Sequence, residues 1–395
     1  MDTLPPLPSD NPQPPPLEEA PPEESSITPD LPHAHVEFPC ENCGARMDFS
    51  PSSQKVTCPY CQHEMDIPQN EDEIEELDFH AYVTQTLKAE DTVDALTVTC
   101  ATCHAETTLE ENVTATNCPF CGSAIVTDPG HRRVIRPRSL LPFRVEDKEA
   151  MGLFREWIGK LWFAPTKVKQ YARTHKGNLS GVYVPYWTYD ANTISHYTGK
   201  RGDDYYVTEH YTTTENGRSV SRTRQVRKTR WRNVSGNVFR SFDDVLVLAS
   251  HSLPDKHIQK LEPWDLNALV PYDQNYLAGF RAEAYQVDLE SGFTEAKNIM
   301  EPEIRQEVKR DIGGDHQRIS SLTTQYKQPT FKHILLPVWI SAYSFKGTTY
   351  RFLVNARTGE VQGERPYSAI KITFAVIAGL LLAAIIAYVV YKNQG

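Results

Sequence analysis

Eight cysteines in two equally spaced clusters constrain the fold of this chain more than any other feature. Each cluster reads Cys-x2-Cys, fourteen residues, Cys-x2-Cys, and the second begins sixty residues after the first. The candidate ligands are Cys40, Cys43, Cys58 and Cys61, then Cys100, Cys103, Cys118 and Cys121. Two tight knuckles with adjacent thiolates can supply the four tetrahedral ligands that Zn²⁺ prefers. We therefore predict two structural zinc ions.

The same cysteine spacing is also compatible with a redox dithiol or a rubredoxin-like iron site. His63 and His104 lie close to the knuckles and are weaker candidate ligands. Gly44 and Gly122 each follow a knuckle, where positive φ lets backbone amides turn toward the sulfur atoms. Gln62 and His104 occupy the other two such positions, so the glycine pattern is incomplete.

The sixty-residue repeat extends beyond the cysteines to apolar flanking positions, as in Met65 and Ile125. The other matched pairs are Val36 with Leu96, Phe38 with Val98, and Phe49 with Leu109. A repeat of this kind indicates a duplicated module. We expect zinc ribbon 1 at residues 36–68 and zinc ribbon 2 at residues 96–129.

The remaining segments differ sharply in composition. Residues 1–35 are acidic and rich in proline, which predicts a disordered arm. Residues 69–95 form an acidic linker whose Phe79, Tyr82, Val83 and Leu87 have helical spacing, and a solvated linker is the alternative. Residues 130–367 are expected to form one α+β domain, and residues 368–395 a membrane anchor.

Within residues 130–367, apolar spacing predicts both helices and strands. Residues 147–162 place Met151, Phe154, Ile158 and Leu161 on one helical face, and residues 295–312 indicate a second, charged helix. Strands are expected at 181–193, 242–250, 281–289, 333–345 and 349–361, with hairpin turns at Asn216-Gly217 and Thr358-Gly359. The shared Pro-x-Trp of residues 185–187 and 337–339 suggests an internal duplication. The fold class expected is α+β with an antiparallel sheet.

Residues 372–391 form an uncharged apolar run long enough to span a bilayer as a helix. Arg357, Arg365 and Lys371 precede the run and Lys392 follows it, which favours a cytoplasmic N-terminal part. The acidic N-terminus has no signal-peptide pattern, and reduced cysteines require the same side of the membrane. We expect a tail-anchored, single-pass protein of the bacterial inner (cytoplasmic) membrane.

Charge is divided unevenly along the chain. Residues 1–130 carry 25 Asp+Glu and 3 Lys+Arg, a net charge of −22, whereas the whole chain has −10. Nucleic-acid binding depends on basic residues that neutralise phosphates, so the acidic ribbons are expected to bind protein partners.

One basic stretch stands out in the second half of the chain. On a strand, one face would present Arg222, Arg224, Lys228, Arg230 and Arg232, with Trp231 on the other face. Anionic lipid, single-stranded nucleic acid, the acidic N-terminus or solvent alone could face these side chains.

Two further patterns have residue types that occur in catalytic sites. Asp311, Asp315, His316 and Arg318 surround two glycines, but this segment has no nucleophile paired with a base, so a structural turn is expected. Residues 152–162 lack the spacing and the Ser or Thr of a phosphate-binding loop. We therefore expect no enzymatic activity.

The sequence resembles bacterial membrane-anchored zinc-ribbon proteins commonly labelled primosomal protein N′ (replication factor Y), superfamily II helicase, or TFIIB-type zinc ribbon-containing protein. The resemblance runs from about residue 36 to the end and includes PYWTYDA, FDDVLVLAS, DIGGDHQRI, LPVWISAYSF and VNARTGEVQGERP. The label implies helicase action in replication restart. A helicase motor needs a phosphate-binding loop, however, and this sequence has none.

These features together favour a membrane-anchored, zinc-binding adaptor that presents protein-interaction surfaces in the cytoplasm. The alternative is a nucleic-acid-associated factor linked to replication, with the basic strand as its contact.

Overall fold

The computed structural model describes residues 39–68, 74–84, 92–108, 115–126, 130–174, 179–215, 218–253, 255–345 and 348–394. Several expected features lie outside these ranges: the proline-rich arm 1–35, Val36, Phe38, Leu87, Leu109 and the turn Asn216-Gly217. The mixed α+β fold is confirmed, with two groups of four cysteines near the N-terminus and one apolar C-terminal helix.

Three long strands form the middle of the main sheet. β11 (Ser180–Glu215) lies between β12 (Arg218–Leu248) and β15 (His316–Phe345), and both pairings are antiparallel. β15 also pairs with β16 (Thr348–Asn355), which pairs with β17 (Val361–Gly363) across the turn at Gly359, where φ is 80°. These strands are much longer than the sequence pattern predicted, because polar residues continue the ladder beyond the apolar segments.

Two segments, each running from a short strand through helix to a long strand, interlock in this sheet. The first is β10 (Ser139–Leu140), α2 (Asp147–Lys160), α3 (Thr166–Thr174) and β11; the second is β14 (Arg281–Ala282), α5 (Leu289–Ile312) and β15. β10 pairs in parallel with β15, and β14 pairs in parallel with β11. Each short strand therefore joins the long strand of the other segment.

The two Pro-x-Trp motifs hold this crossed arrangement. Trp187 Nε1 donates to Val287 O, just before α5, at 2.9 Å, and Trp339 Nε1 donates to Val145 O, just before α2, at 2.8 Å. Each indole N–H thus satisfies a carbonyl at the start of the other segment's helix. The repetition seen in the sequence corresponds to a structural duplication.

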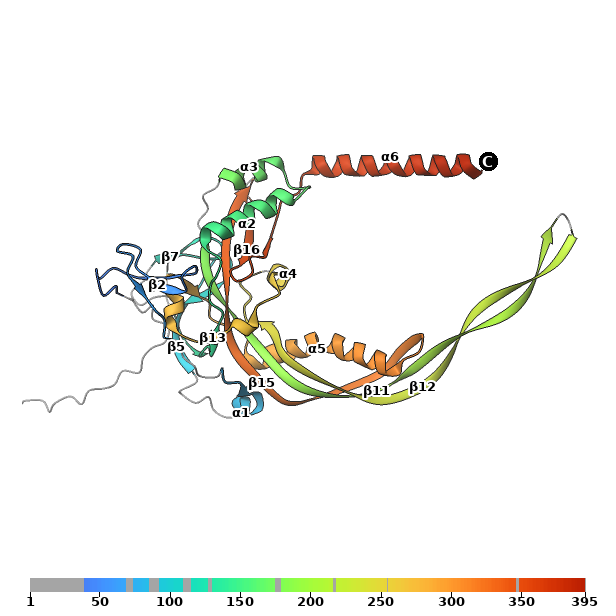
Figure 1. Ribbon diagram of the computed structural model, residues 1–395, viewed down its shortest axis with the longest axis horizontal. Coiled ribbons are helices and arrows are strands. Elements are labelled where there is room, and N and C mark those ends of the chain that lie inside the picture. Colours follow the sequence, from blue (N-terminus) through green and yellow to red (C-terminus); the bar gives the residue numbers. More distant parts are fainter. Residues whose placement is uncertain are drawn as a thin grey trace, which may run out of the picture. The chain divides into compact units, whose positions relative to one another are not determined.

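α2 (Asp147–Lys160) and α5 (Leu289–Ile312) cover the same face of the sheet. The predicted apolar face of α2 is buried through Met151, Phe154 and Ile158, and Phe154 stacks on Phe352 with ring centroids 3.6 Å apart. α5 begins at Leu289, six residues earlier than expected, because Asp288 caps it by accepting from Ser291 N at 2.8 Å. Figure 1 shows α5 running alongside the long strands.

The expected strand at 281–289 is wrong for most of its length, since β14 has only two residues and α5 already begins at Leu289. The segment 255–280 between β12 and β14 consists of short elements. They are α4 (Asp255–Ile258), 3₁₀ turns at Gln259–Leu261, Leu266–Ala268 and Gln274–Leu277, and β13 (Val270–Pro271).

The acidic linker packs against the sheet through β4 (Leu77–Asp78) and α1 (Phe79–Thr84). Phe79 is buried against Phe293, with ring centroids 4.5 Å apart, whereas Val83 is 40% exposed, so the predicted apolar face is shorter than expected. Lys332, with only 7% of its surface exposed, pairs with Glu76 at 3.0 Å and Asp244 at 2.8 Å. This buried cation ties the linker to β15 and β12.

Glu283 is a buried carboxylic acid directly after β14, with 3% of its surface exposed. Ser250 Oγ donates to Glu283 Oε1 at 2.6 Å, and Ser252 Oγ donates to the same oxygen. Glu283 Oε2 has no hydrogen-bond partner among the described residues. Burial raises the pKa of this carboxyl to about 8, although the two serine bonds lower it.

We predict that this acid makes stability depend on pH. The pKa of Glu283 is higher in the folded state than its unfolded value of 4.5. Between about pH 4.5 and pH 8, the folded state therefore keeps a proton on Glu283 that the unfolded state has already lost. Unfolding free energy should therefore fall with pH across that window, by up to about 1.4 kcal/mol per pH unit. Glu283→Gln should remove this component in denaturant unfolding followed by tryptophan fluorescence. An unchanged slope would contradict the prediction.

Candidate metal centres

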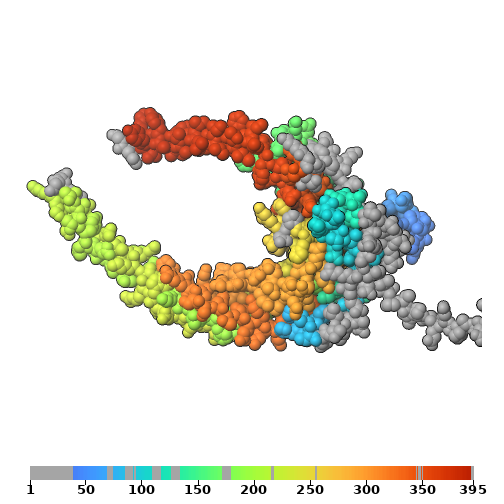
Figure 2. Space-filling view, turned by 180° about the vertical axis from the view of Figure 1, so that it is seen from behind, coloured from blue at the N-terminus to red at the C-terminus, as the bar shows by residue number. Residues whose placement is uncertain are grey.

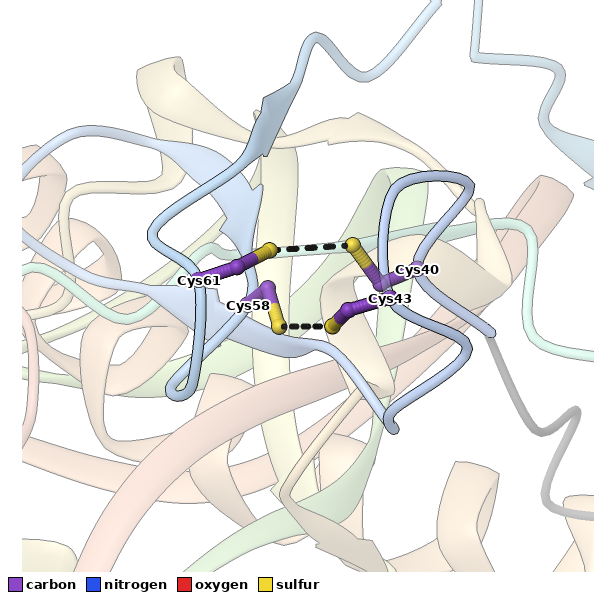
Figure 3. A group of neighbouring side chains, drawn as sticks. All are labelled: Cys40, Cys43, Cys58 and Cys61. Carbon is purple, nitrogen blue, oxygen red and sulfur yellow. Dashed lines mark hydrogen bonds between the residues drawn. The ribbon is translucent and has the colours of Figure 1, made fainter.

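The four cysteines of each cluster lie together in the structure. In the first, Cys40 Sγ lies 3.4 Å from Cys61 Sγ, and Cys43 Sγ lies 3.5 Å from Cys58 Sγ (Figure 3). In the second, the corresponding distances are 3.6 Å for Cys100 and Cys121 and 3.5 Å for Cys103 and Cys118.

These distances fit a metal centre. Four thiolates placed tetrahedrally at the usual Zn–S bond length would lie about 3.8 Å apart. All four sulfur atoms of each group lie within 4.8 Å of one another, and none of the eight cysteines forms a disulfide. Each group could therefore hold one metal ion with four protein ligands. Neither His63 nor His104 belongs to these groups.

The knuckles share one backbone turn. The carbonyl of the first cysteine accepts from the amide four residues later, as in Cys40 O with Gly44 N at 2.7 Å and Cys100 O with His104 N at 2.8 Å. That later residue has positive φ in every knuckle: 72° at Gly44, 60° at Gln62, 57° at His104 and 75° at Gly122. Gln62 and His104 thus adopt the conformation for which glycine is best suited.

Backbone amide groups also lower the pKa values of cysteine thiols. The amide of His63 lowers the pKa of the Cys61 thiol to about 6. The Ala45 amide lowers the pKa of Cys43, but hydrogen bonds with Cys61 and Cys58 outweigh it and raise that pKa to about 12. A metal that binds all four as thiolates must therefore displace protons, and its affinity will fall as the pH falls.

The sixty-residue repeat also governs the strands around the cysteines. Ribbon 1 contains β1 (Asp48–Ser50), β2 (Lys55–Thr57) and β3 (Glu64–Met65) in one sheet. In ribbon 2, β7 (Ala115–Asn117) and β8 (Ala124–Val126) lie sixty residues after β2 and β3 and pair in the same way. Ribbon 2 adds β5 (Thr92–Thr99), which pairs with β6 (Glu106–Thr108) and β9 (Gly130–Ile135).

Ribbon 1 packs against one face of the main sheet. Phe49 N donates to Ala278 O at 2.9 Å, and the Phe49 ring contacts Tyr276, with centroids 5.3 Å apart. Cys40, Cys58 and Val56 belong to the same buried cluster as Tyr183 and Trp339, which lie on that face. The metal site is therefore continuous with the core of the α+β domain.

Ribbon 2 packs against the opposite face of the same strands. Cys100, Cys118 and Phe120 belong to the buried cluster that contains Val182 and Leu336. Since successive residues of a strand point to opposite faces, Val182 and Tyr183 direct the two ribbons to different sides. Arg281 Nη1 also donates to Asn117 O at 2.7 Å, and Thr108 Oγ1 to Ala282 O at 2.8 Å.

One aromatic position differs between the ribbons. Phe120, in the second knuckle of ribbon 2, is buried with 1% of its surface exposed, whereas its counterpart Tyr60 in ribbon 1 is 81% exposed. Phe120 attaches ribbon 2 to the core. Tyr60 leaves an amphipathic aromatic side chain on the surface beside the Cys58 and Cys61 knuckle.

The basic stretch lies on β12, within a two-stranded arm. β15 pairs with β11 only as far as Gly202, so Asp203–Glu215 and Arg218–Arg230 pair with each other alone among the described strands. In Figure 2 this arm is yellow-green. Strand alternation places the predicted cations Arg222, Arg224, Lys228, Arg230 and Arg232 on one face and Trp231 on the other.

Anions and tyrosines share this basic face. Glu209 pairs with Arg224 at 3.3 Å and with Lys228 at 3.1 Å, and Arg232 lies 3.7 Å from Asp203. The guanidinium of Arg230 lies 5.2 Å from the Tyr205 ring centre, and that of Arg224 lies 5.5 Å from the Tyr211 ring centre. Part of the positive charge is thus compensated within the arm.

Gly313, Gly314 and Asp315 form the turn between α5 and β15. Gly313 and Gly314 have φ of 64° and 74°. The Tyr197 hydroxyl donates to Asp311 at 2.6 Å. Asp204 interacts with two residues that follow the glycines: its backbone N donates to Asp315 at 2.8 Å, and its Oδ1 lies 3.1 Å from His316 Nε2. Arg318 lies over Trp231 at 4.2 Å. These side chains join the turn to the base of the arm.

Comparisons with known proteins give one distant relative. No family model matches the chain, and no solved structure matches it. The chain is similar to the uncharacterized protein YdjG of Bacillus subtilis (strain 168), with 26% identity over 270 residues, which cover 65% of this chain and 72% of the relative. These comparisons give no support to the resemblance to primosomal protein N′.

The positive φ of the knuckles gives a testable pair of substitutions. Gly122→Ala should destabilise the protein by about 1 kcal/mol, and His104→Gly should stabilise it by a similar amount, since glycine adopts positive φ without steric cost. A Cβ at Gly122 would meet no atom within 4 Å, so the cost is purely conformational. Thermal unfolding of the metal-loaded protein should show opposite shifts in Tm. Shifts of the same sign would contradict this account.

Proposed function

We propose that the protein is a membrane-anchored, zinc-binding adaptor without enzymatic activity, which binds a protein partner through the exposed surface of ribbon 1. The observation that carries this proposal is the contrast between the exposed Tyr60 and the buried Phe120. Exposed tyrosines on a rigid support are typical centres of protein interfaces. The acidic composition of the ribbons also favours a protein over nucleic acid as the partner.

Zinc is the metal proposed for both sites. Four thiolates close each site, which leaves no coordination position for a substrate and favours a structural role. In this proposal Cys40, Cys43, Cys58 and Cys61 hold one ion and the second cluster holds the other. The metal supplies folding energy to two modules whose own strands are only two to eight residues long.

The anchor proposed is α6 (Ala369–Gln394), whose residues Ala369–Lys392 are long and apolar enough to cross a membrane and are not buried in the described part of the protein. Aromatic residues cluster at its start: Trp162 is 73% exposed and Tyr367 is 60% exposed, and Lys371 Nζ donates to Trp162 O at 3.2 Å. Trp, Tyr and Lys are enriched at the membrane interface. We place the N-terminal part in the cytoplasm, on the bacterial inner membrane.

A nucleic-acid-associated role is the second candidate, favoured by the arm of β11 and β12. A two-stranded ribbon that presents arginines interleaved with tyrosines offers both phosphate contacts and stacking surfaces. The partial neutralisation by Glu209 and Asp203 makes this the weaker proposal.

Two tyrosine substitutions distinguish the candidates. We expect Tyr60→Ala to weaken partner binding by about 30-fold, equivalent to about 2 kcal/mol, since aromatic side chains dominate interface energies. Tyr211→Ala is the matched control, because Tyr211 is 40% exposed and contacts Arg224 on the basic face of the arm. Partners would first be identified by photo-crosslinking from position 60 in intact membranes, and their affinity then measured for both variants.

Loss of binding only in Tyr60→Ala would support the adaptor proposal. Loss only in Tyr211→Ala, or crosslinks from position 211 to nucleic acid with none from position 60, would support the second candidate instead. Both variants must retain the metal content and the Tm of the unmodified protein, so that altered folding is separated from lost contact.

A further inference from the structure

β12 is an edge strand of the main sheet. It pairs with β11 on one side, and no strand in the described part of the chain pairs with its other side. Ala249 N donates to Pro185 O of β11 at 3.0 Å. In an antiparallel pair every second residue points its backbone N–H and C=O toward the partner strand, so Val247 and Val245 also point theirs toward β11. The backbone groups of Leu246 and Leu248 therefore point outward, where another chain could pair with them.

A groove of about 970 Å³ follows this edge along residues 240–248. α5 forms one wall, with Ser291, Glu295 and Ile299, and the segment between β12 and β14 forms the other, with Glu262, Trp264 and Leu266. A strand edge beside a helix is a common setting in which an extended peptide adds a strand to a sheet.

The groove offers apolar contacts and an unused donor. Leu246, Leu248 and Leu266 are only partly buried, and Ile299 on α5 is 44% exposed. The indole N–H of Trp264, a residue only 9% exposed, finds no acceptor among the described residues. A buried donor without a partner is costly, and a carbonyl of an added strand would remove that cost.

Charge indicates which segment fits. Asp244 is paired with Lys332, and Glu303 with Arg240. The groove-lining Asp243, Glu262 and Glu295 have no ion pair within the described ranges. The rim is therefore negative, which favours a basic segment. It disfavours residues 1–38 of this chain, which contain eight Asp+Glu and no Lys or Arg.

We propose that the β12 edge at Phe242–Leu248 is a docking site for an extended, basic segment of a partner protein. The segment adds as a strand beside β12, with aliphatic side chains against Leu246, Leu248 and Ile299 and with Lys or Arg side chains over the acidic rim. This site does not include Tyr60 or any other residue of ribbon 1, so failure of the Tyr60 experiment leaves it standing.

The test uses the full chain in lipid nanodiscs and a fluorescent nine-residue peptide of alternating lysine and valine. A peptide of alternating glutamate and valine is the charge control. We expect the basic peptide alone to bind in fluorescence polarisation, and hydrogen exchange to slow at residues 242–248 when it does. Ile299→Lys should weaken this binding at least about tenfold, because it adds bulk and positive charge to the wall.

Thr294→Lys is the matched variant, because Thr294 is exposed on the same helix but does not line the groove. Equal binding by this variant and the unmodified protein supports the proposal. Equal weakening in both variants, binding of the acidic peptide, or protection confined to the arm would overturn it. So would a dimer whose β12 edge is already protected without peptide, since a second copy would then occupy the groove.

Discussion

The packing of both cysteine ribbons against β11 and β15 is the interaction on which the rest of the structure depends. Tyr183 and Trp339 face ribbon 1, and Val182 and Leu336 face ribbon 2. Two strands thus have both faces covered at this point, one face by each cysteine ribbon. The cysteines belong to the same buried clusters as these strand residues, so each tetrad is part of the core rather than a separate module on a linker.

The crossed duplication explains why the two ribbons can share one platform. β10 and β14 each add to the long strand of the other segment, and Trp187 and Trp339 bridge the segments through Val287 and Val145. The halves therefore cannot separate without breaking buried hydrogen bonds. The surfaces proposed above to bind partners, namely Tyr60, the basic arm and the edge of β12, lie outside this shared core.

Much of this could be predicted from the sequence, because the relevant signals are local. Cysteine spacing gave the two tetrads, and helical periodicity gave the buried face of α2. The repeat of Pro-x-Trp indicated the duplication, although its crossed pairing was not predictable, since both parallel pairings join residues far apart in sequence.

Other features depend on tertiary contacts that periodicity does not reveal. The strand expected at 281–289 ends after two residues, because Asp288 caps α5 and its neighbours form the preceding loop. Docking of the ribbons was missed, since equivalent knuckle residues, Tyr60 and Phe120, have opposite exposure. The unusual φ of Gln62 and His104 was also hidden, because neither is glycine.

The most direct test of this account is hydrogen exchange of the full-length protein before and after metal removal by a chelator. If the ribbons are part of the core, protection should fall in both knuckles and also in β11 at residues 182–189 and β15 at residues 334–340. The contradicting result would be loss of protection in the ribbons alone, with these strands unchanged. The ribbons would then be independent modules attached to a self-sufficient domain.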